Sequence, residues 1–383
     1  MLDGHTYRLS EALARRKLPN WHLAQFHSVC FDNGPFPQET YGVSELWQLM
    51  DTMQETRFEG YMQSFNGLLA SELNLLVDAM TDLVIFQRTF MPDVPVRLPY
   101  STLMSALAVY QKLRRYHPSF KTILEIGPGC GYNSLFLKRH TELTNYTQIE
   151  ACQAFYLLQN ALNCFSFPGR FEEKAFPELA AGATNAFTTD RAFIEALDTL
   201  SDEYAPKCTH VPWWRLGDIA HGTAKFDVVT TNATLCEMKA EAFTDYLEII
   251  SRVLAPDGVV ICQCLGGEVT MPLEHLRDRL FDAGYAPLTY IDRGGKKFMS
   301  DPLTGESFEM FSPVGLGVFV RGGHPLFEKN YVRANFDRDF VAADESVVRA
   351  LHSPDPRRQY YRAVEIREMV KYRLEARFAD ELN

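Results

Sequence analysis

The chain has 383 residues, of which 46% are hydrophobic and 23% charged, a composition that excludes long disorder and allows one large domain with appendages or two domains. Its formal net charge of -11 excludes a general electrostatic attraction to nucleic acid or to anionic membranes. No apolar stretch has the length of a transmembrane helix and the amino terminus lacks a secretory signal pattern, so we expect a cytoplasmic protein with no membrane span.

The amino-terminal 99 residues predict a helical region. Apolar residues recur every three or four positions over 44–62 and again over 64–86, which is typical of amphipathic helices. A proline-rich link at 91–100 then leads into a further helix expected over 101–116. We expect residues 1–99 to form a lid or substrate region.

Strands and helices alternate from Lys121 onward. Apolar runs of strand length occur at 122–127, 145–150, 209–216, 225–232, 259–265, 286–292 and 315–322. Such alternation predicts an α/β fold, with a Rossmann-like, seven-stranded, mostly parallel and doubly wound sheet. The last two strands are expected to form an antiparallel pair at one edge. We assign this domain to residues 100–325.

Two segments interrupt this alternation. Residues 165–208 join a helix to a strand by a connection far longer than usual, so we expect an insertion there. Residues 326–383 form a polar tail that is helical in part. Three arrangements fit the tail: it covers a groove, extends the amino-terminal helices, or contacts a second copy in a homo-oligomer.

The stretch TILEIGPGCGYNSLFL, residues 122–137, joins a buried strand to a helix through three glycines. The dinucleotide fingerprint needs its third glycine where Tyr132 stands, and the Gly-Lys-Ser/Thr ending of a P-loop is missing. The glycines at 127, 129 and 131 therefore predict a close approach of main chain to a ligand that has no phosphate group.

The pattern Glu125-x-Gly127-x-Gly129-x-Gly131 resembles motif I of the class I S-adenosylmethionine-dependent methyltransferases. This resemblance implies that S-adenosyl-L-methionine is the cofactor. It also implies that Glu125 and the three glycines form part of the cofactor site.

Further positions match the order of motifs in that family. Glu150 ends the second strand, where a carboxylate can accept two hydrogen bonds from the ribose hydroxyls. In the resembled family an acidic residue after the third strand receives the adenine amino group, and Asp218 matches it. Leu216 or Ile219 would then lie against the purine. Asn232, at the end of the fourth strand, is expected to hydrogen-bond cofactor or substrate.

The segment TNATLCEMKAEAFTDYL, residues 231–247, is similar to the motif IV region of bacterial sugar O-methyltransferases. The matching positions are Asn232 and Glu237, which we take as the candidate catalytic residues. Glu237 would act as general base or hold a sugar hydroxyl. The alternative is structural, because a carboxylate there can also stabilise the first turn of the following helix.

The resemblance leaves the acceptor open among small molecules and glycans. O-methylation of a sugar or glycan is the leading hypothesis, and methylation of a small natural product or peptide is the second. The third hypothesis is a non-catalytic subunit that binds S-adenosylmethionine and scaffolds a partner. Nucleic-acid bases are disfavoured because the chain has neither an Asp/Asn-Pro-Pro-Tyr motif after the fourth strand nor a Pro-Cys pair.

No pattern of a metal site is present. The eight cysteines lack the spacing of metal ligands, so we expect reduced and buried thiols. No compact cluster of carboxylates identifies a divalent ion, and we assign no metal ligand.

Overall fold

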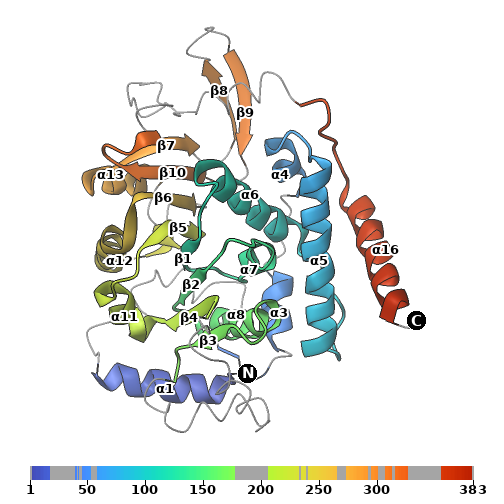
Figure 1. Ribbon diagram of the computed structural model, residues 1–383, viewed down its shortest axis with the longest axis horizontal. Coiled ribbons are helices and arrows are strands. Elements are labelled where there is room, and N and C mark those ends of the chain that lie inside the picture. The colour runs from blue at the N-terminus through green and yellow to red at the C-terminus, as the bar shows by residue number, and fades with distance from the viewer. Residues whose placement is uncertain are drawn as a thin grey trace.

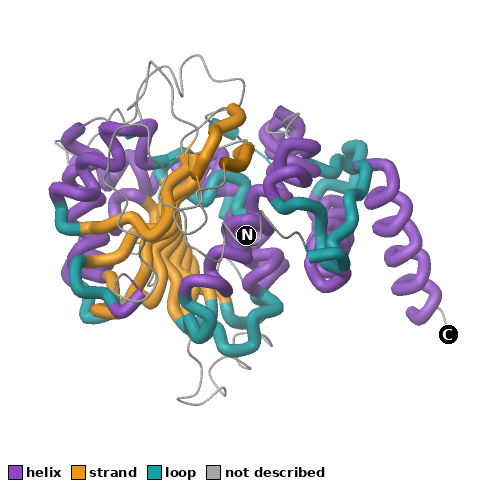
Figure 2. The backbone as a smooth tube through the Cα atoms, turned by 90° about the horizontal axis from the view of Figure 1, so that it is seen from above, coloured by secondary structure: helices purple, strands orange, loops and turns teal. Residues whose placement is uncertain are grey.

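The computed structural model describes residues 2–17, 39–40, 42, 45–52, 58–176, 206–232, 234–238, 240–264, 273–291, 295–300, 307–312, 315–326 and 355–381. One large sheet runs through the molecule, helices cover both of its faces, and further helices stand to one side (Figure 1). Figure 2 shows the same layers from above, with the strands between two groups of helices. No helix in these ranges is long and apolar enough to cross a membrane.

Eight strands form the large sheet. They are β1 (Thr122–Ile126), β2 (Asn145–Glu150), β3 (Phe171–Glu173), β4 (Cys208–Pro212), β5 (Phe226–Asn232), β6 (Leu254–Cys264), β7 (Tyr285–Ile291) and β10 (Gly315–Arg321). Their order is β3-β4-β2-β1-β5-β6-β10-β7. The pairs from β3 to β6 are parallel, whereas β10 is antiparallel to both of its neighbours. This confirms the Rossmann-like, doubly wound sheet with an antiparallel edge pair.

The seven expected strands are present, and β3 adds an eighth at the edge. It falls inside the insertion expected at 165–208, of which residues 177–205 lie outside the described ranges. The strand expected over 209–216 is too long, because β4 ends at Pro212 and its neighbour β2 ends at the paired residue Glu150. Trp213–Arg215 instead form a 3₁₀ turn, η3, and the helix α11 (Leu216–His221) follows.

The strands alternate side chains between two cores, one on each face of the sheet. Ile123 packs with helices α5 (Ala70–Phe90), α6 (Tyr100–Tyr116), α7 (Asn133–Leu137) and α8 (Gln153–Ser166). Leu124, the next residue, packs on the other face with α11, α12 (Ala240–Val253) and α13 (Leu273–Asp282). Both side chains are fully buried, as expected for a central parallel strand.

The remaining described helices add buried residues to the core that contains Ile123. They are α1 (Gly4–Lys17), α3 (Leu46–Thr52), α4 (Phe58–Ser64) and α16 (Ala363–Glu381), and a two-stranded sheet is formed by β8 (Gly295–Ser300) and β9 (Ser307–Ser312). The short helix α1 lies at the β3–β4 edge, and α16 lies beside α5 (Figure 1). Ile366, Val370 and Leu374 of α16 are buried at four-residue intervals, so one face of this helix packs against the protein.

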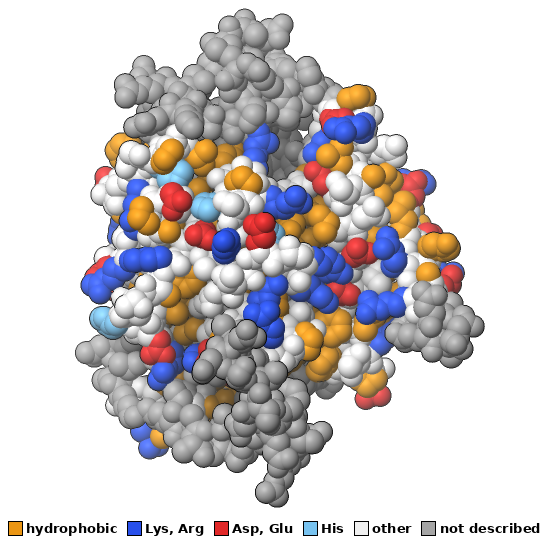
Figure 3. All heavy atoms as spheres, in the orientation of Figure 1, with side chains coloured by type: hydrophobic (Ala, Val, Ile, Leu, Met, Phe, Trp, Pro, Cys, Tyr) orange, Lys and Arg blue, Asp and Glu red, His pale blue; other side chains and the backbone are white. Residues whose placement is uncertain are grey.

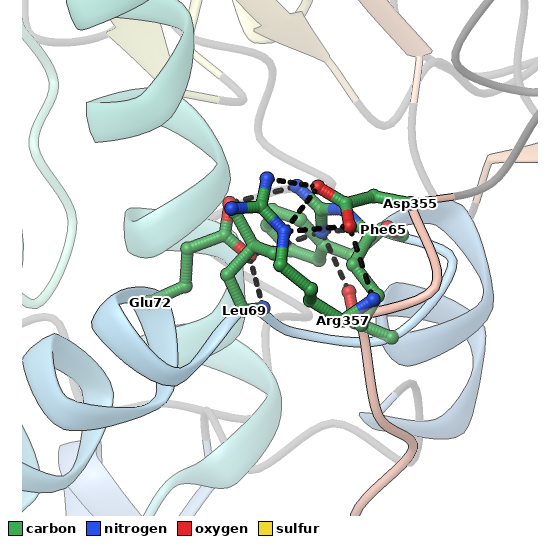
Figure 4. Close-up of polar contacts among 7 residues, drawn as sticks. Phe65, Leu69, Glu72, Asp355 and Arg357 are labelled. Atoms are coloured by element: carbon green, nitrogen blue, oxygen red, sulfur yellow. Dashed lines mark hydrogen bonds and ion pairs between the residues drawn. The ribbon is translucent and has the colours of Figure 1, made fainter.

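A half-buried arginine fixes the chain before α16. Arg358 pairs with Glu72 of α5 at 2.8 Å and 3.0 Å, and it donates to the carbonyl oxygens of Phe65 and Gly67 at 2.9 Å and 2.7 Å. Figure 4 shows this junction, with Glu72 of α5 and with Phe65 and Leu69 of the segment between α4 and α5 beside Asp355 and Arg357 of the tail. The described part of the tail therefore extends the amino-terminal helices.

Asp82 joins three elements on this side of the molecule. Its buried carboxylate lies 2.8 Å from the Lys138 ammonium, 2.7 Å from the Arg139 guanidinium and 3.4 Å from that of Arg377. Figure 3 shows Lys and Arg side chains gathered over the middle of this face, although the protein is acidic as a whole. Because Lys138 and Arg139 directly follow α7, Asp82 connects α16 to the helix after the glycine turn.

The strand order fixes where a ligand binds. From β1 the chain crosses to β2 on one side, while β5 lies on the other side of β1. In an open parallel sheet, ligands bind at the carboxyl ends of the strands beside such a switch in order. The turn after β1 and the segment after β5 therefore border the expected site.

Candidate functional site

Three glycines with positive φ shape the turn between β1 and α7. The φ angles are 65° at Gly127, 58° at Gly129 and 73° at Gly131, all in the left-handed region that side chains with a Cβ rarely adopt. The Gly127 N–H donates to the carbonyl oxygen of Ile149 in β2 at 2.8 Å. The turn is therefore held at the carboxyl ends of both β1 and β2.

The first two glycines face different surroundings. A Cβ on Gly127 would lie 1.8 Å from Thr234 Oγ1, whereas a Cβ on Gly129 would meet no atom of the described residues within 4 Å. Thr234 follows β5, and its hydroxyl donates to the Gly127 carbonyl oxygen at 3.0 Å. Gly127 thus allows the segment after β5 to touch the turn, and Gly129 borders open space in which a ligand can lie against the main chain.

Glu125 lies behind the turn. The residue is fully buried, and its carboxylate accepts hydrogen bonds from the Asn133 amide at 2.5 Å and from the Tyr146 hydroxyl. Burial raises the pKa of Glu125 to about 7, and the hydrogen bonds from Tyr146 and Asn133 oppose this rise. Both carboxylate oxygens are engaged by the protein, so Glu125 positions the start of α7.

Glu150 lies beside the turn, at the end of β2. One of its oxygens accepts from the backbone N–H groups of Ala151 and Cys152 at 2.8 Å and 2.9 Å, and the other accepts from Gln159 Nε2 at 2.9 Å. Burial raises the pKa of Glu150 to about 7, and hydrogen bonds from Cys152, Gln159 and the Gly129 backbone act against this rise. The carboxylate is therefore next to the open space at Gly129.

Gln159 connects the turn to a buried histidine. Its amide Nε2 also donates to the Gly129 carbonyl oxygen at 2.5 Å, and its Oε1 lies 2.9 Å from His210 Nε2. The His210 ring stacks on Tyr156 with centroids 3.7 Å apart, and its Nδ1 lies 3.5 Å from a Glu173 oxygen. A continuous polar chain thus runs from the edge strand β3 to the glycine turn. Its one visible sequence signal is the presence of polar residues within the apolar helix FYLLQNALNCF.

The candidate catalytic residues lie in the segment after β5. Asn232 ends β5, and its Oδ1 accepts from Gln263 Nε2 at 3.2 Å at the end of β6. Gln263 also donates to the Ser105 hydroxyl of α6. Glu237 ends the 3₁₀ turn η4 (Leu235–Glu237), is half-buried, and its backbone N–H donates to the Thr234 carbonyl oxygen at 3.1 Å. Through Thr234 the structure brings this segment against Gly127.

Asp218 and Ile219 lie further from the strand ends than expected. Both belong to α11, because β4 ends at Pro212 and η3 intervenes. The Asp218 carboxylate is 44% exposed and lies 2.6 Å from Arg215 Nη2, and Ile219 packs at the edge of the core under α11. The position directly after β4 is taken by Trp213, whose indole N–H donates to Glu11 of α1 at 2.9 Å.

The described ranges contain no group of three or more His, Cys, Asp or Glu side chains placed to hold a metal ion. Burial raises the pKa of the Cys152 thiol to about 12 and that of Cys164 to about 11, so these two cysteines stay protonated.

Comparisons with solved structures return methyltransferases. A magnesium protoporphyrin IX methyltransferase from Synechocystis PCC 6803 with bound S-adenosylhomocysteine is 12% identical, with 62% of this chain and 93% of that chain covered and a TM-score of 0.33. An amino pentose methyltransferase from Micromonospora echinaspora with bound S-adenosylmethionine is 14% identical, with 60% and 99% covered and a TM-score of 0.32. A ribosomal protein L11 methylase from Lactobacillus delbrueckii is 12% identical, with 58% and 79% covered and a TM-score of 0.31.

No protein-family model matches the chain, and no curated protein does. The strand order and strand directions of the chain itself define a Rossmann-like, doubly wound sheet with an antiparallel edge pair.

Proposed function

We propose that this protein is an S-adenosylmethionine-dependent methyltransferase. The observation that carries the proposal is the open space beside Gly129, in a left-handed turn at the switch point of the sheet, with Glu150 next to it. A ligand lying there meets bare main chain on one side and a carboxylate on the other. This suits a cofactor that has ribose hydroxyls and no phosphate.

Each residue of the turn has a separate role in this proposal. The cofactor supplies a methyl group on a sulfonium, an electrophile that a nucleophile attacks in line. Gly129 gives the cofactor access to the main chain, and Gly127 with Thr234 keeps the turn against the segment after β5. Glu125 holds the turn from behind, while Glu150 accepts the ribose hydroxyls by exchanging its present backbone and Gln159 partners.

We propose further that the acceptor is a hydroxyl of a sugar or glycan. This is supported by the similarity of residues 231–247 to sugar O-methyltransferases and by the contact of that segment with Gly127 through Thr234. Glu237 would take the proton of the attacking hydroxyl, and Asn232 would orient it. Residues 1–99 and the insertion at 165–208 would form the lid that excludes water.

Turnover with a panel of nucleotide sugars and glycans tests this proposal. Production of S-adenosylhomocysteine with a sugar acceptor is the expected result. Turnover with a small natural product or peptide, and none with sugars, would show that the acceptor belongs to that class instead. Cofactor binding without product for any acceptor would favour a scaffold subunit.

Two variants test the catalytic assignment. Glu237→Gln keeps the size of the side chain but removes the base, so we expect kcat to fall by about 100-fold or more while cofactor affinity stays unchanged. Asn232→Ala should lower kcat and raise the acceptor KM. A Glu237→Gln enzyme with unchanged kcat would assign this residue to stabilisation of α12.

A further inference from the structure

The helix α1 is fixed over the carboxyl ends of two neighbouring strands. Gln153, at the start of α8 and close after Glu150, donates to the Gly4 carbonyl oxygen at 3.1 Å. Trp213, which directly follows β4, donates its indole N–H to Glu11 Oε1 at 2.9 Å. Glu150 and Pro212 are paired residues at the ends of β2 and β4. Residues at the start and in the middle of α1 therefore touch the segments that leave these two strand ends.

Tyr7 is the buried residue of α1 in this region. Its ring centroid lies 5.0 Å from that of Trp214, which follows β4, and 5.0 Å from that of Tyr156 in α8. The residue is 0% exposed, and its hydroxyl has no hydrogen-bond partner within the described part of the chain. Burial, and then the nearby Glu11 carboxylate, raise the pKa of Tyr7 well above its ordinary value, so the hydroxyl keeps its proton and can donate.

Three more buried polar atoms near Tyr7 lack a partner among the described residues. They are Ser10 Oγ in α1, Thr40 Oγ1 and Gln153 Oε1. Gln153 links this group, because its Nε2 lies 3.1 Å from the Gly4 oxygen and 3.3 Å from the Thr40 oxygen. Buried polar groups in folded proteins are nearly always hydrogen-bonded, so several unsatisfied atoms at one interface indicate a polar occupant.

We propose that α1 forms part of the cofactor site, and that the Tyr7 hydroxyl hydrogen-bonds to the adenosine portion of S-adenosylmethionine. This inference rests on the proposed function, because it takes the ribose to lie at Glu150. An adenosine held there extends across the ends of β2 and β4, the region that α1 covers. The Trp214 ring beside Tyr7 is only partly buried, so it can offer flat apolar surface to a purine.

Glu11 of α1 brings a carboxylate to the end of β4. The role of Asp218 as acceptor of the adenine amino group stays a prediction, and its carboxylate lies on α11 paired with Arg215. Glu11 holds a second carboxylate at Trp213, directly after β4. A residue more than two hundred positions before Trp213 thus borders the end of the same strand.

The variant Tyr7→Phe tests the proposal because it removes one oxygen and keeps the ring. We expect the Kd for S-adenosylhomocysteine to rise about fivefold to tenfold, the loss that follows from one hydrogen bond. The thermal midpoint of the ligand-free protein should stay the same or rise, because an unsatisfied buried hydroxyl has been removed.

Tyr285→Phe is the matched control. Tyr285 is equally buried, but its hydroxyl lies 3.2 Å from the Ser251 hydroxyl and it belongs to β7 at the far edge of the sheet. We expect this variant to lower the thermal midpoint and to leave the Kd unchanged. In the wild-type protein, S-adenosylhomocysteine should also slow amide hydrogen exchange over residues 4–17.

The outcomes separate this proposal from the proposed function. If the wild-type chain fails to bind S-adenosylhomocysteine, the proposed function is wrong. If the wild-type chain binds and Tyr7→Phe binds equally well, the role of Tyr7 is wrong. A Tyr7→Phe variant that loses affinity together with a lower ligand-free midpoint would assign Tyr7 to packing and also overturn the proposal.

Discussion

The variant Gly129→Ala distinguishes a role of this residue in binding the cofactor from a role in the stability of the fold. Gly129 has a φ of 58°, and a Cβ added there would lie within 4 Å of no atom in the part of the chain that the structure describes. The cost of Gly129→Ala to the free energy of unfolding is therefore that of the left-handed conformation alone, about 1–2 kcal/mol. If the cofactor lies against this main chain, the new methyl group occupies part of its space. We then expect the affinity for S-adenosylmethionine to fall at least tenfold, or about 1.4 kcal/mol.

Gly127→Ala has a different expected cost. Its φ of 65° carries the same conformational penalty, but the new Cβ would also lie 1.8 Å from Thr234 Oγ1 and 2.5 Å from Thr234 Cγ2. The segment after β5 must move, and such overpacking typically adds about 1–3 kcal/mol. The free energy of unfolding should therefore fall by about 2–5 kcal/mol in total.

Gly169→Ala is the control for both variants. Gly169 has a φ of 68° and open space around its Cβ position, but it lies in the turn between α8 and β3. It should lose the same stability as Gly129→Ala in denaturant unfolding and show no change in calorimetric affinity. If Gly129→Ala binds S-adenosylmethionine as tightly as Gly169→Ala does, the cofactor does not touch Gly129.

Two further predictions concern stability. The pKa values of Glu125 and Glu150, about 7 against an ordinary 4.5, mean that the folded protein binds more protons than the unfolded chain between these values. The stabilisation that each carboxyl provides below pH 4.5 is therefore lost as the pH rises through 7, and the loss is about 3 kcal/mol for each carboxyl. In denaturant unfolding, Glu125→Gln should make the free energy of unfolding depend less steeply on pH over this range. Arg358→Ala should lower the free energy of unfolding by about 2 kcal/mol and expose residues 355–381 to proteolysis. Arg357→Ala, one residue earlier and 79% exposed, should do neither.

The parts of the fold that follow from local pattern were predictable. The run Ile123–Ile126 is apolar apart from Glu125, and glycines follow it directly, so strand, turn and helix were all evident. The end of β4 was not, because it depends on where the neighbouring strand stops and not on the residues Trp213–Leu216 themselves. Strand β3 has three half-buried residues, Phe171–Glu173, which is too few to show a period.

In the candidate site too, residues close to strand ends could be predicted from the sequence, and residues brought in by distant elements could not. The positions of Gly127, Gly129 and Glu150 were predictable because each lies at the end of a strand or within three residues after it. Asp218 was assigned by its match to the resembled family and its role stays a prediction, whereas the strand expected to end at Leu216 ends at Pro212. The contacts made by Tyr7 and Gln263 come from elements far apart in the sequence, as in the bond between Gln263 and Ser105, which are 158 positions apart. No local signal identifies such residues before the fold is known.

Calorimetric titration of the wild-type chain with S-adenosylhomocysteine tests whether the glycine turn after β1 holds this ligand. We predict saturable heat with one site per chain, strongly weakened in Gly129→Ala and retained in Gly169→Ala. Absence of heat with both S-adenosylhomocysteine and S-adenosylmethionine, from a protein that unfolds cooperatively, would contradict it.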